Sequence, residues 1–109
     1  MSKSIIANYR QSGNLLFFSG VTGESGDAKT QIANIFEKMK KNLQDAGSSM
    51  ENVLSVLVFL KDLNDRPTAL NPLWEKHFPT NPPSRTTVQA ELGPGMLAEM
   101  TFTAQTRAD

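Results

Sequence analysis

The sequence predicts an α+β protein in which two helices cover one face of a mixed β-sheet. Three features indicate this class: an apolar stripe at helical spacing over residues 28–43, an apolar run at 53–60, and alternation of apolar and polar residues near the end of the chain. The predicted elements follow the order strand, helix, strand, helix, strand, strand, which favours helices layered against a sheet. We expect residues 1–109 to form a single domain, because that length suits one hydrophobic core.

The first half of the chain contains the clearest helix. Residues 14–20 form an apolar run between two glycines, which predicts a buried strand, and residues 21–26 predict a loop. From Asp27 onward apolar residues recur every three or four positions; they are Ala28, Ile32, Ile35, Met39 and Leu43. Gly47 is expected to end this helix, because glycine readily takes a positive φ. A short strand at residues 4–9 is also expected.

The second half predicts a central strand, a helix and two further strands. Residues 53–60 are apolar on both faces and rich in β-branched side chains. A polar turn at 61–65 precedes a helix that ends near Phe78. Pro72 leaves two starts open, one at Pro72 capped by Asn71 and one near Asp65 with a kink, and we favour a broken start. After an extended loop at 79–83, strands are expected at 85–92 and 96–105, joined by a turn at 93–95.

The second face of the sheet is predicted to be polar but almost free of charge. The side chains expected there are Thr87, Gln89, Thr101, Thr103 and Gln105. Such a face suits packing against another copy of the chain, and closed symmetry would bury several such faces together. In a plain hairpin Gln89 would lie opposite Glu99, with Arg85 about 13 Å along the strand.

Composition excludes several classes of function. Eleven Lys and Arg balance eleven Asp and Glu, which disfavours a protein that binds nucleic acid by neutralising phosphates. The absence of Cys excludes disulfides, thiolate zinc sites and a Cys nucleophile, and a single His excludes a multi-histidine metal site in one chain. No apolar signal segment or membrane span is present in the sequence, so we expect a cytoplasmic protein with no membrane partner.

Arg85 and Glu99 are the strongest candidates for chemistry. Arg85 follows a Pro-Pro-Ser segment that fixes its backbone, and a guanidinium can bind a carboxylate through two parallel hydrogen bonds. The alternative for Arg85 is an ordinary surface ion pair. Glu99 interrupts an apolar strand. A partly buried Glu can orient or deprotonate a water, and the alternative is a solvated strand position.

Three other polar residues have weaker cases. Tyr9 can donate a phenolic hydrogen bond or simply pack as an aromatic ring. His77 has no acid partner in the sequence pattern, so an exposed or capping role is expected. Ser19 has no base nearby and is expected to end a strand beside Gly20. The glycines match no phosphate-binding spacing.

Six segments, in order, resemble the RidA/YjgF family between Tyr9 and Ala104. They are the strand at 13–20 (GNLLFFSG), the helix end at 43–47 (LQDAG), the strand and turn at 52–65, the helix at 71–78 with its Asn71, Trp74 and Phe78, the signature at 83–88 (PSRTTV), and the segment at 98–100 (AEM). Each segment is modest alone, but six in the right order are specific.

The resemblance implies a chorismate-mutase-like fold and a homotrimer formed through the sheet, with clefts between neighbouring subunits. It also implies cofactor-free and metal-free hydrolysis of enamines and imines, such as 2-aminoacrylate and 2-iminobutyrate, to 2-keto acids and ammonia. Arg85 falls on the family arginine that binds the substrate carboxylate, and Glu99 on the glutamate that holds the attacking water. Tyr9 falls on the family tyrosine, Gly20 on the strand-end glycine, and Thr87 on a position whose backbone N–H reaches the ligand.

The chain departs from the family pattern around this predicted cleft. Ala7-Asn8 replaces the usual Gly-Pro before the tyrosine, Val21 stands where Gln is frequent, and Pro72 is atypical. Two other functions stay open: a module that binds a small carboxylate without turnover, and the endoribonuclease or translation-inhibitor activity attributed to some members. Glu99 favours catalysis, because binding alone needs only the arginine. The balanced charge disfavours nucleic acid as a partner.

Overall fold

The computed structural model describes residues 4–107. The strands are β1 (Tyr9–Ser12), β2 (Leu15–Thr22), β3 (Val53–Leu60), β4 (Ser84–Gln89) and β5 (Ala98–Gln105). The helical elements are α1 (Ala28–Asp45), a 3-10 turn η1 (Met50–Asn52), a π-helical turn η2 (Arg66–Leu70) and α2 (Asn71–His77).

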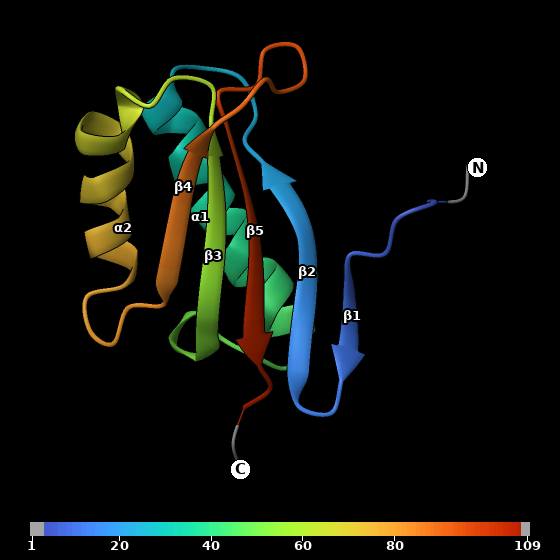
Figure 1. Cartoon of the computed structure of the whole chain (residues 1–109). Helices are drawn as coiled ribbons and strands as arrows, with labels where there is room; N and C mark the ends of the chain where they lie inside the picture. The colour runs from blue at the N-terminus through green and yellow to red at the C-terminus, as the bar shows by residue number, and fades with distance from the viewer. Residues whose placement is uncertain (1–3, 108–109) are drawn as a thin grey trace.

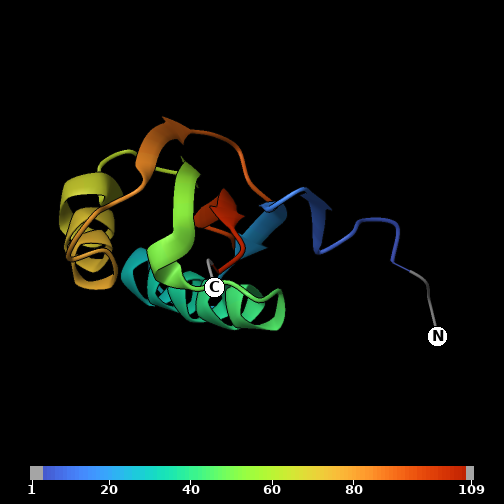
Figure 2. The same ribbon diagram turned by 90° about the horizontal axis from the view of Figure 1, so that it is seen from below.

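The five strands form one mixed sheet in the order β1-β2-β5-β3-β4 (Figure 1). β3 and β4 run parallel, and the other neighbours run antiparallel. Figure 2 shows α1 and α2 on the same side of the sheet, with α2 next to the β4 edge. The predicted mixed sheet with two helices on one face is therefore confirmed.

Helix α1 supplies much of the core. The side chain of Asp27 caps the helix by accepting a hydrogen bond from the backbone N–H of Thr30 at 2.9 Å. One stripe of α1 is completely buried; it consists of Ile32, Ile35, Phe36, Met39 and Leu43. Gly47 has a φ of 80°, as expected for the residue that ends such a helix. The sheet side of this core consists of alternate residues of β2, β3 and β5.

The second helix has the interrupted start that Pro72 predicted. The chain winds as a π-turn over η2 and continues directly into α2, with Pro72 in the first turn of α2. A proline removes an N–H donor, and its ring collides with the carbonyl four residues earlier in an α-helix. Wider winding just before Pro72 relieves both effects. This arrangement still buries Leu70, Trp74 and Phe78 against α1 and the sheet.

Two boundaries at the N-terminal end differ from expectation. The first strand lies at Tyr9–Ser12, not at residues 4–9, and it pairs with β2 as an edge hairpin. Strand β2 continues to Thr22, so residues 21 and 22 are strand where a loop was expected. The register shifts between Phe18 and Val21, and this irregularity returns Val21 to the buried face opposite Met100.

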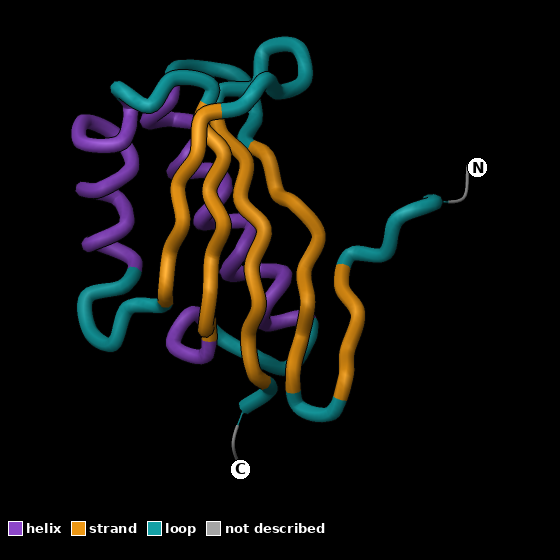
Figure 3. The backbone as a smooth tube through the Cα atoms, in the orientation of Figure 1, coloured by secondary structure: helices purple, strands orange, loops and turns teal. Residues whose placement is uncertain are grey.

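The expected hairpin between the last two strands is wrong. Strand β4 pairs with β3, and β5 lies between β2 and β3, so a long loop joins β4 to β5 (Figure 3). Gln89 is in register with Leu60, and Glu99 is in register with Phe59. The Gly93–Met96 turn does form, with a 3.0 Å backbone hydrogen bond. Alternating polarity predicts which residues of a strand share a face, but not which strand it pairs with. Here β3 is the neighbour of both β4 and β5.

The face expected for Thr87 and Gln89 is also wrong. Arg85, Thr87 and Gln89, which we call the β4 row, are in register with Val56, Val58 and Leu60, and those three residues are buried on the helix side. Neighbours in register share a face of the sheet, so the β4 row points toward the helix layer. The open face carries the predicted polar residues of β5. It also carries apolar side chains: Phe17, Leu57, Phe59 and Val88.

Candidate functional site

Arg85 lies at the β4 edge, against α2. Its guanidinium carbon is 5.0 Å from the centre of the Trp74 ring, a cation–π contact that holds the side chain in one orientation. Partial burial, and then the positive charge of Arg66, lower the pKa of Arg85 from its ordinary value. The group stays cationic at neutral pH, because the ordinary pKa of an arginine lies far above neutrality. Within residues 4–107 it forms no ion pair, so an ordinary surface ion pair is not its role.

Thr87 lies two positions beyond Arg85 in the same row. Its hydroxyl oxygen Oγ1 is buried and has no hydrogen-bond partner in the described part of the chain. A buried hydroxyl without a partner is costly, so such groups are found where a ligand, a water or another chain completes them. The family resemblance implies that the backbone N–H of Thr87 reaches the ligand. The unpartnered hydroxyl is a second polar group at this position.

Glu99 and Gly20 form the second part of the predicted site, on the open face of the sheet. Glu99 alternates with the buried Ala98 and Met100, and it is half-buried. A Cβ at position 20 would overlap the carboxylate oxygen Oε2 of Glu99. Only a glycine at this position therefore leaves room for the carboxylate. Ser19 donates its hydroxyl proton to the carbonyl of Ala7 at 2.7 Å, which gives it a structural role beside Gly20.

Tyr9 lies on β1, at the opposite edge of the sheet from Arg85. It is in register with Phe18, and the two ring centres are 5.3 Å apart, on the helix side of the sheet. The residue is 36% exposed, so part of it is open to a partner outside the chain.

One chain does not bring these residues together. Four strand spacings separate β1 from β4, which is roughly 19 Å at ~4.8 Å per spacing. Arg85 points toward the helix layer, whereas Glu99 points to the open face. A hollow of about 450 Å³ lies between α1, η1 and the end of α2, and none of the five predicted site residues lines it. A site that uses both Arg85 and Glu99 therefore needs more than one chain.

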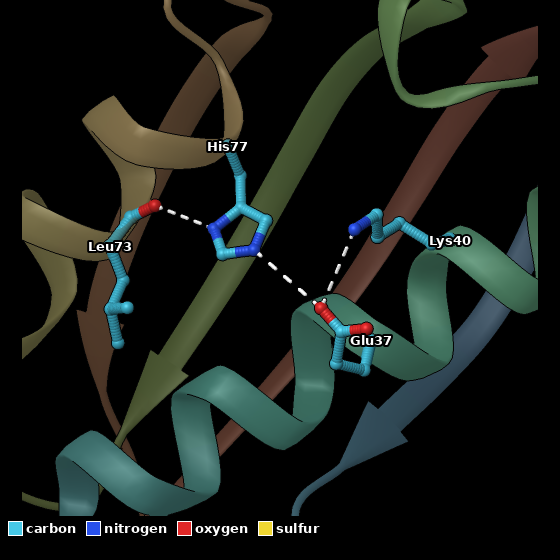
Figure 4. Close-up of polar contacts among 4 residues, drawn as sticks. All are labelled: Glu37, Lys40, Leu73 and His77. Atoms are coloured by element: carbon cyan, nitrogen blue, oxygen red, sulfur yellow. Dashed lines mark hydrogen bonds and ion pairs between the residues drawn. The ribbon is translucent and has the colours of Figure 1, made fainter.

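His77 belongs to the helix packing, not to this site. Its ring stacks on Phe36 with the ring centres 4.4 Å apart. Its Nδ1 donates to the carbonyl of Leu73 at 2.9 Å, and its Nε2 lies 3.9 Å from Glu37, which also pairs with Lys40 (Figure 4). The expected exposed role is wrong, because the side chain is 11% exposed and has an acid partner. The bond to the Leu73 carbonyl in the last turn of α2 agrees with the capping alternative. The acid partner comes from α1, so the sequence spacing within α2 gave no sign of it.

Residues 4–107 give no sign of a metal centre or of a membrane-spanning helix. No group of three or more His, Cys, Asp or Glu side chains in this part of the chain is arranged to hold a metal ion. No helix described here has the length and apolar character needed to cross a bilayer.

Comparison with protein families gives one match across almost the whole chain. Residues 2–106 match the family model described as endoribonuclease L-PSP. A RutC family protein of Pyrococcus abyssi is 36% identical over 97 residues, which cover 81% of this chain and 76% of that protein. A 3-aminoacrylate deaminase RutC of Acinetobacter baylyi is 36% identical over 80 residues, which cover 72% of this chain and 63% of that protein.

Solved structures give the same fold. A member of the YjgF protein family from Neisseria meningitidis superposes with a TM-score of 0.91 at 26% identity, covering 99% of this chain and 92% of the other. An uncharacterized protein from Pseudomonas aeruginosa superposes with a TM-score of 0.87 at 32% identity, covering 94% and 91%. The expected YjgF-type fold is therefore confirmed.

Proposed function

Because this chain belongs to the endoribonuclease L-PSP family, together with the RutC and YjgF proteins, we propose that it is an imine deaminase. Its substrates are small 2-imino acids and their enamine tautomers, such as 2-iminobutyrate and 2-aminoacrylate, and its products are 2-keto acids and ammonia. The deaminase relative supports this reaction class, because 3-aminoacrylate is also an enamine carboxylate. The chemistry needs neither metal nor cofactor.

The observation that carries the proposal is the state of Arg85. Its guanidinium is partly buried, stacked on Trp74 and without an ion pair among the described residues. A planar cation in that state is ready to bind a carboxylate through two parallel hydrogen bonds. In the bound imine the carboxylate is attached to the reacting carbon, so binding the carboxylate also places that carbon.

Glu99 then holds the attacking water. It accepts a proton from the water as the oxygen forms a bond to the imine carbon, and this proton passes to the nitrogen. Glu99 then takes the remaining proton from the hydroxyl of the adduct and passes it to the nitrogen as the carbon–nitrogen bond breaks. Ammonia leaves, and the water oxygen remains as the keto oxygen. One imine and one water thus give one keto acid and one ammonia. Acid–base assistance of this kind is worth roughly 10²–10⁴-fold, which suits so reactive an electrophile.

We propose that the site is completed between copies of the chain, in a homotrimer. Arg85 at one sheet edge would meet Glu99 and Gly20 of a neighbouring copy, since one chain keeps Arg85 and Glu99 on opposite faces of its sheet. Tyr9 would add its hydroxyl from the β1 edge. The apolar side chains of the open face support association, with Phe17 46% exposed and Val88 37% exposed.

Two alternative functions predict different results. A binding module would hold a keto acid through Arg85 without accelerating hydrolysis. An endoribonuclease, the activity in the description of the family model, would cleave RNA. The balance of eleven basic and eleven acidic residues gives no support to RNA as the ligand.

The test is keto-acid release from 2-aminoacrylate and 2-iminobutyrate, generated in situ by a dehydratase or an amino-acid oxidase. We expect the wild-type protein to accelerate release and Arg85→Ala to lose the acceleration. The matched control is Lys41→Ala, which removes a positive charge from the exposed face of α1, where Lys41 pairs with Asp45. It should keep full activity. Equal activity in wild type and Arg85→Ala would rule out the proposed role of Arg85.

A further inference from the structure

We propose that this site accepts a 2-imino acid with a second carboxylate at the far end of its side chain, and that Arg66 binds this second carboxylate. The inference rests on the proposed function, because it extends the same site beyond Arg85. Its substrate class is the small 2-imino dicarboxylic acids, which arise when an acidic amino acid loses two electrons and two protons at its amino-bearing carbon to an oxidising enzyme. The products are a 2-keto dicarboxylic acid and ammonia.

The geometry places Arg66 at the far end of the β4 row. The continuous helix formed by η2 and α2 runs antiparallel to β4 (Figure 1). Arg66 precedes Trp74 by eight residues, about 12 Å at 1.5 Å per residue. Gln89 follows Arg85 by four residues, about 13 Å along the strand. Trp74 lies beside Arg85, so Arg66 lies level with Gln89. A 3.1 Å hydrogen bond from the N–H of Leu63 to Gln89 Oε1 fixes that end.

Polar groups suited to a ligand line the row between the two arginines. The buried Thr87 hydroxyl has no partner in the described chain and lies midway along the row. Gln89 uses its oxygen for Leu63, which leaves its amide N–H groups, both donors, for another acceptor. The row therefore offers a cation at each end and hydrogen-bond groups between them. A dicarboxylate matches the two cations, whereas an apolar side chain would leave Arg66 without an anionic partner.

Charge at the two ends supports the same conclusion. Partial burial, and then the positive charge of Arg66, lower the pKa of Arg85, so the two cations are near enough to interact. Neither arginine forms an ion pair within residues 4–107. Asp62 and Asp65 precede Arg66, but neither contacts it as an ion pair, and burial raises the pKa of Asp65. Two like charges without carboxylate partners are stabilised when an anionic ligand binds between them.

The experiment compares two keto acids of equal length as product analogues, 2-oxoglutarate and 2-oxopentanoate, by titration calorimetry of the intact protein. They differ only in the terminal carboxylate. We expect wild type to bind 2-oxoglutarate about twofold to fivefold more tightly, the range for a partly exposed charged pair. Arg66→Gln should remove this preference and leave 2-oxopentanoate binding unchanged. Arg66→Lys should keep part of it, and Lys41→Ala should keep all of it.

The outcomes separate this inference from the proposed function. Equal binding of the two keto acids by wild type, or an unchanged preference in Arg66→Gln, would overturn the role of Arg66 while leaving deamination standing. If Arg85→Ala binds both keto acids as well as wild type does, the proposed carboxylate site fails, and the inference fails with it. Circular dichroism of each variant checks that it is folded.

Discussion

Gly20 shows how one residue shapes the chemistry available at Glu99. Any side chain at position 20 would occupy the space of the Glu99 carboxylate. The sequence drew attention to Gly20 only as the end of a strand and as a family position. Its contact with Glu99 depends on the pairing of β2 with β5, residues about eighty positions apart, which no local pattern contains.

Replacing Gly20 with Ala should therefore lower kcat more than it weakens binding of the product. The added methyl group displaces the Glu99 carboxylate while leaving Arg85 in place, and a shift of about 1 Å in a catalytic group can cost roughly 100-fold. Steady-state kinetics and keto-acid binding measure the two effects separately. Gly93→Ala is the matched control, because only the flexible side chain of Met96 lies near that position. Unchanged kcat in Gly20→Ala would separate Glu99 from the reaction.

Trp74 and Arg66 are the residues that sequence reasoning assigned no part in the site. Trp74 was expected on the inner face of its helix, and it is indeed 8% exposed, but its ring also holds Arg85. The resemblance of residues 71–78 to the family's second helix had already singled out Trp74. Arg66 gave no signal, because an arginine in a polar turn resembles any solvated residue. Only the antiparallel packing of α2 on β4 brings it level with the β4 row.

At the scale of elements, Gln31 connects α1 to the loop that leads into β5. Its amide nitrogen donates to the carbonyls of Gly26 and Gly95, both at 3.0 Å, and its Oε1 accepts from the N–H of Leu97 at 2.8 Å. The side chain is 1% exposed. All its hydrogen bonds go to backbone groups, so it fixes the path of the chain just before Glu99.

Replacing Gln31 with Leu should destabilise the protein by about 2–4 kcal/mol, because three backbone groups lose a buried partner. Urea unfolding measures the loss. Gln44→Leu changes an exposed residue of the same helix in the same way and should stay within about 0.5 kcal/mol of wild type. Equal stability of the two variants would mean that water replaces the Gln31 amide.

The positions of the helices and strands could be predicted better than the pairing of the strands in the sheet. Strand β3 and helix α1 lie where the sequence placed them, since long apolar patterns record burial directly. Strand β4 was expected to pair with β5 because a Gly-Pro-Gly turn separates them. It pairs with β3 instead, and its weak pattern, with Val88 as its only large apolar residue, could not indicate which face is covered.

At the scale of the whole molecule, one sheet face is covered by helices and the other is not. The open face carries Phe17, Leu57, Phe59 and Val88 beside the threonines of β5. The sequence predicted a polar face suited to self-association, and the structure adds exposed apolar area to it. The trimer is a prediction. It is made because a single chain keeps Arg85 and Glu99 on opposite faces of the sheet.

The central claim is that Arg85 and Glu99 of different copies form one catalytic site. The most direct test mixes two inactive variants, Arg85→Ala and Glu99→Gln, by co-expression, with sedimentation used to establish the size of the mixed oligomer. In a randomly mixed trimer about a quarter of the clefts would combine an intact Arg85 with an intact Glu99, so imine hydrolysis should return to about a quarter of the wild-type rate. Mixed oligomers that remain as inactive as either variant alone would contradict the claim.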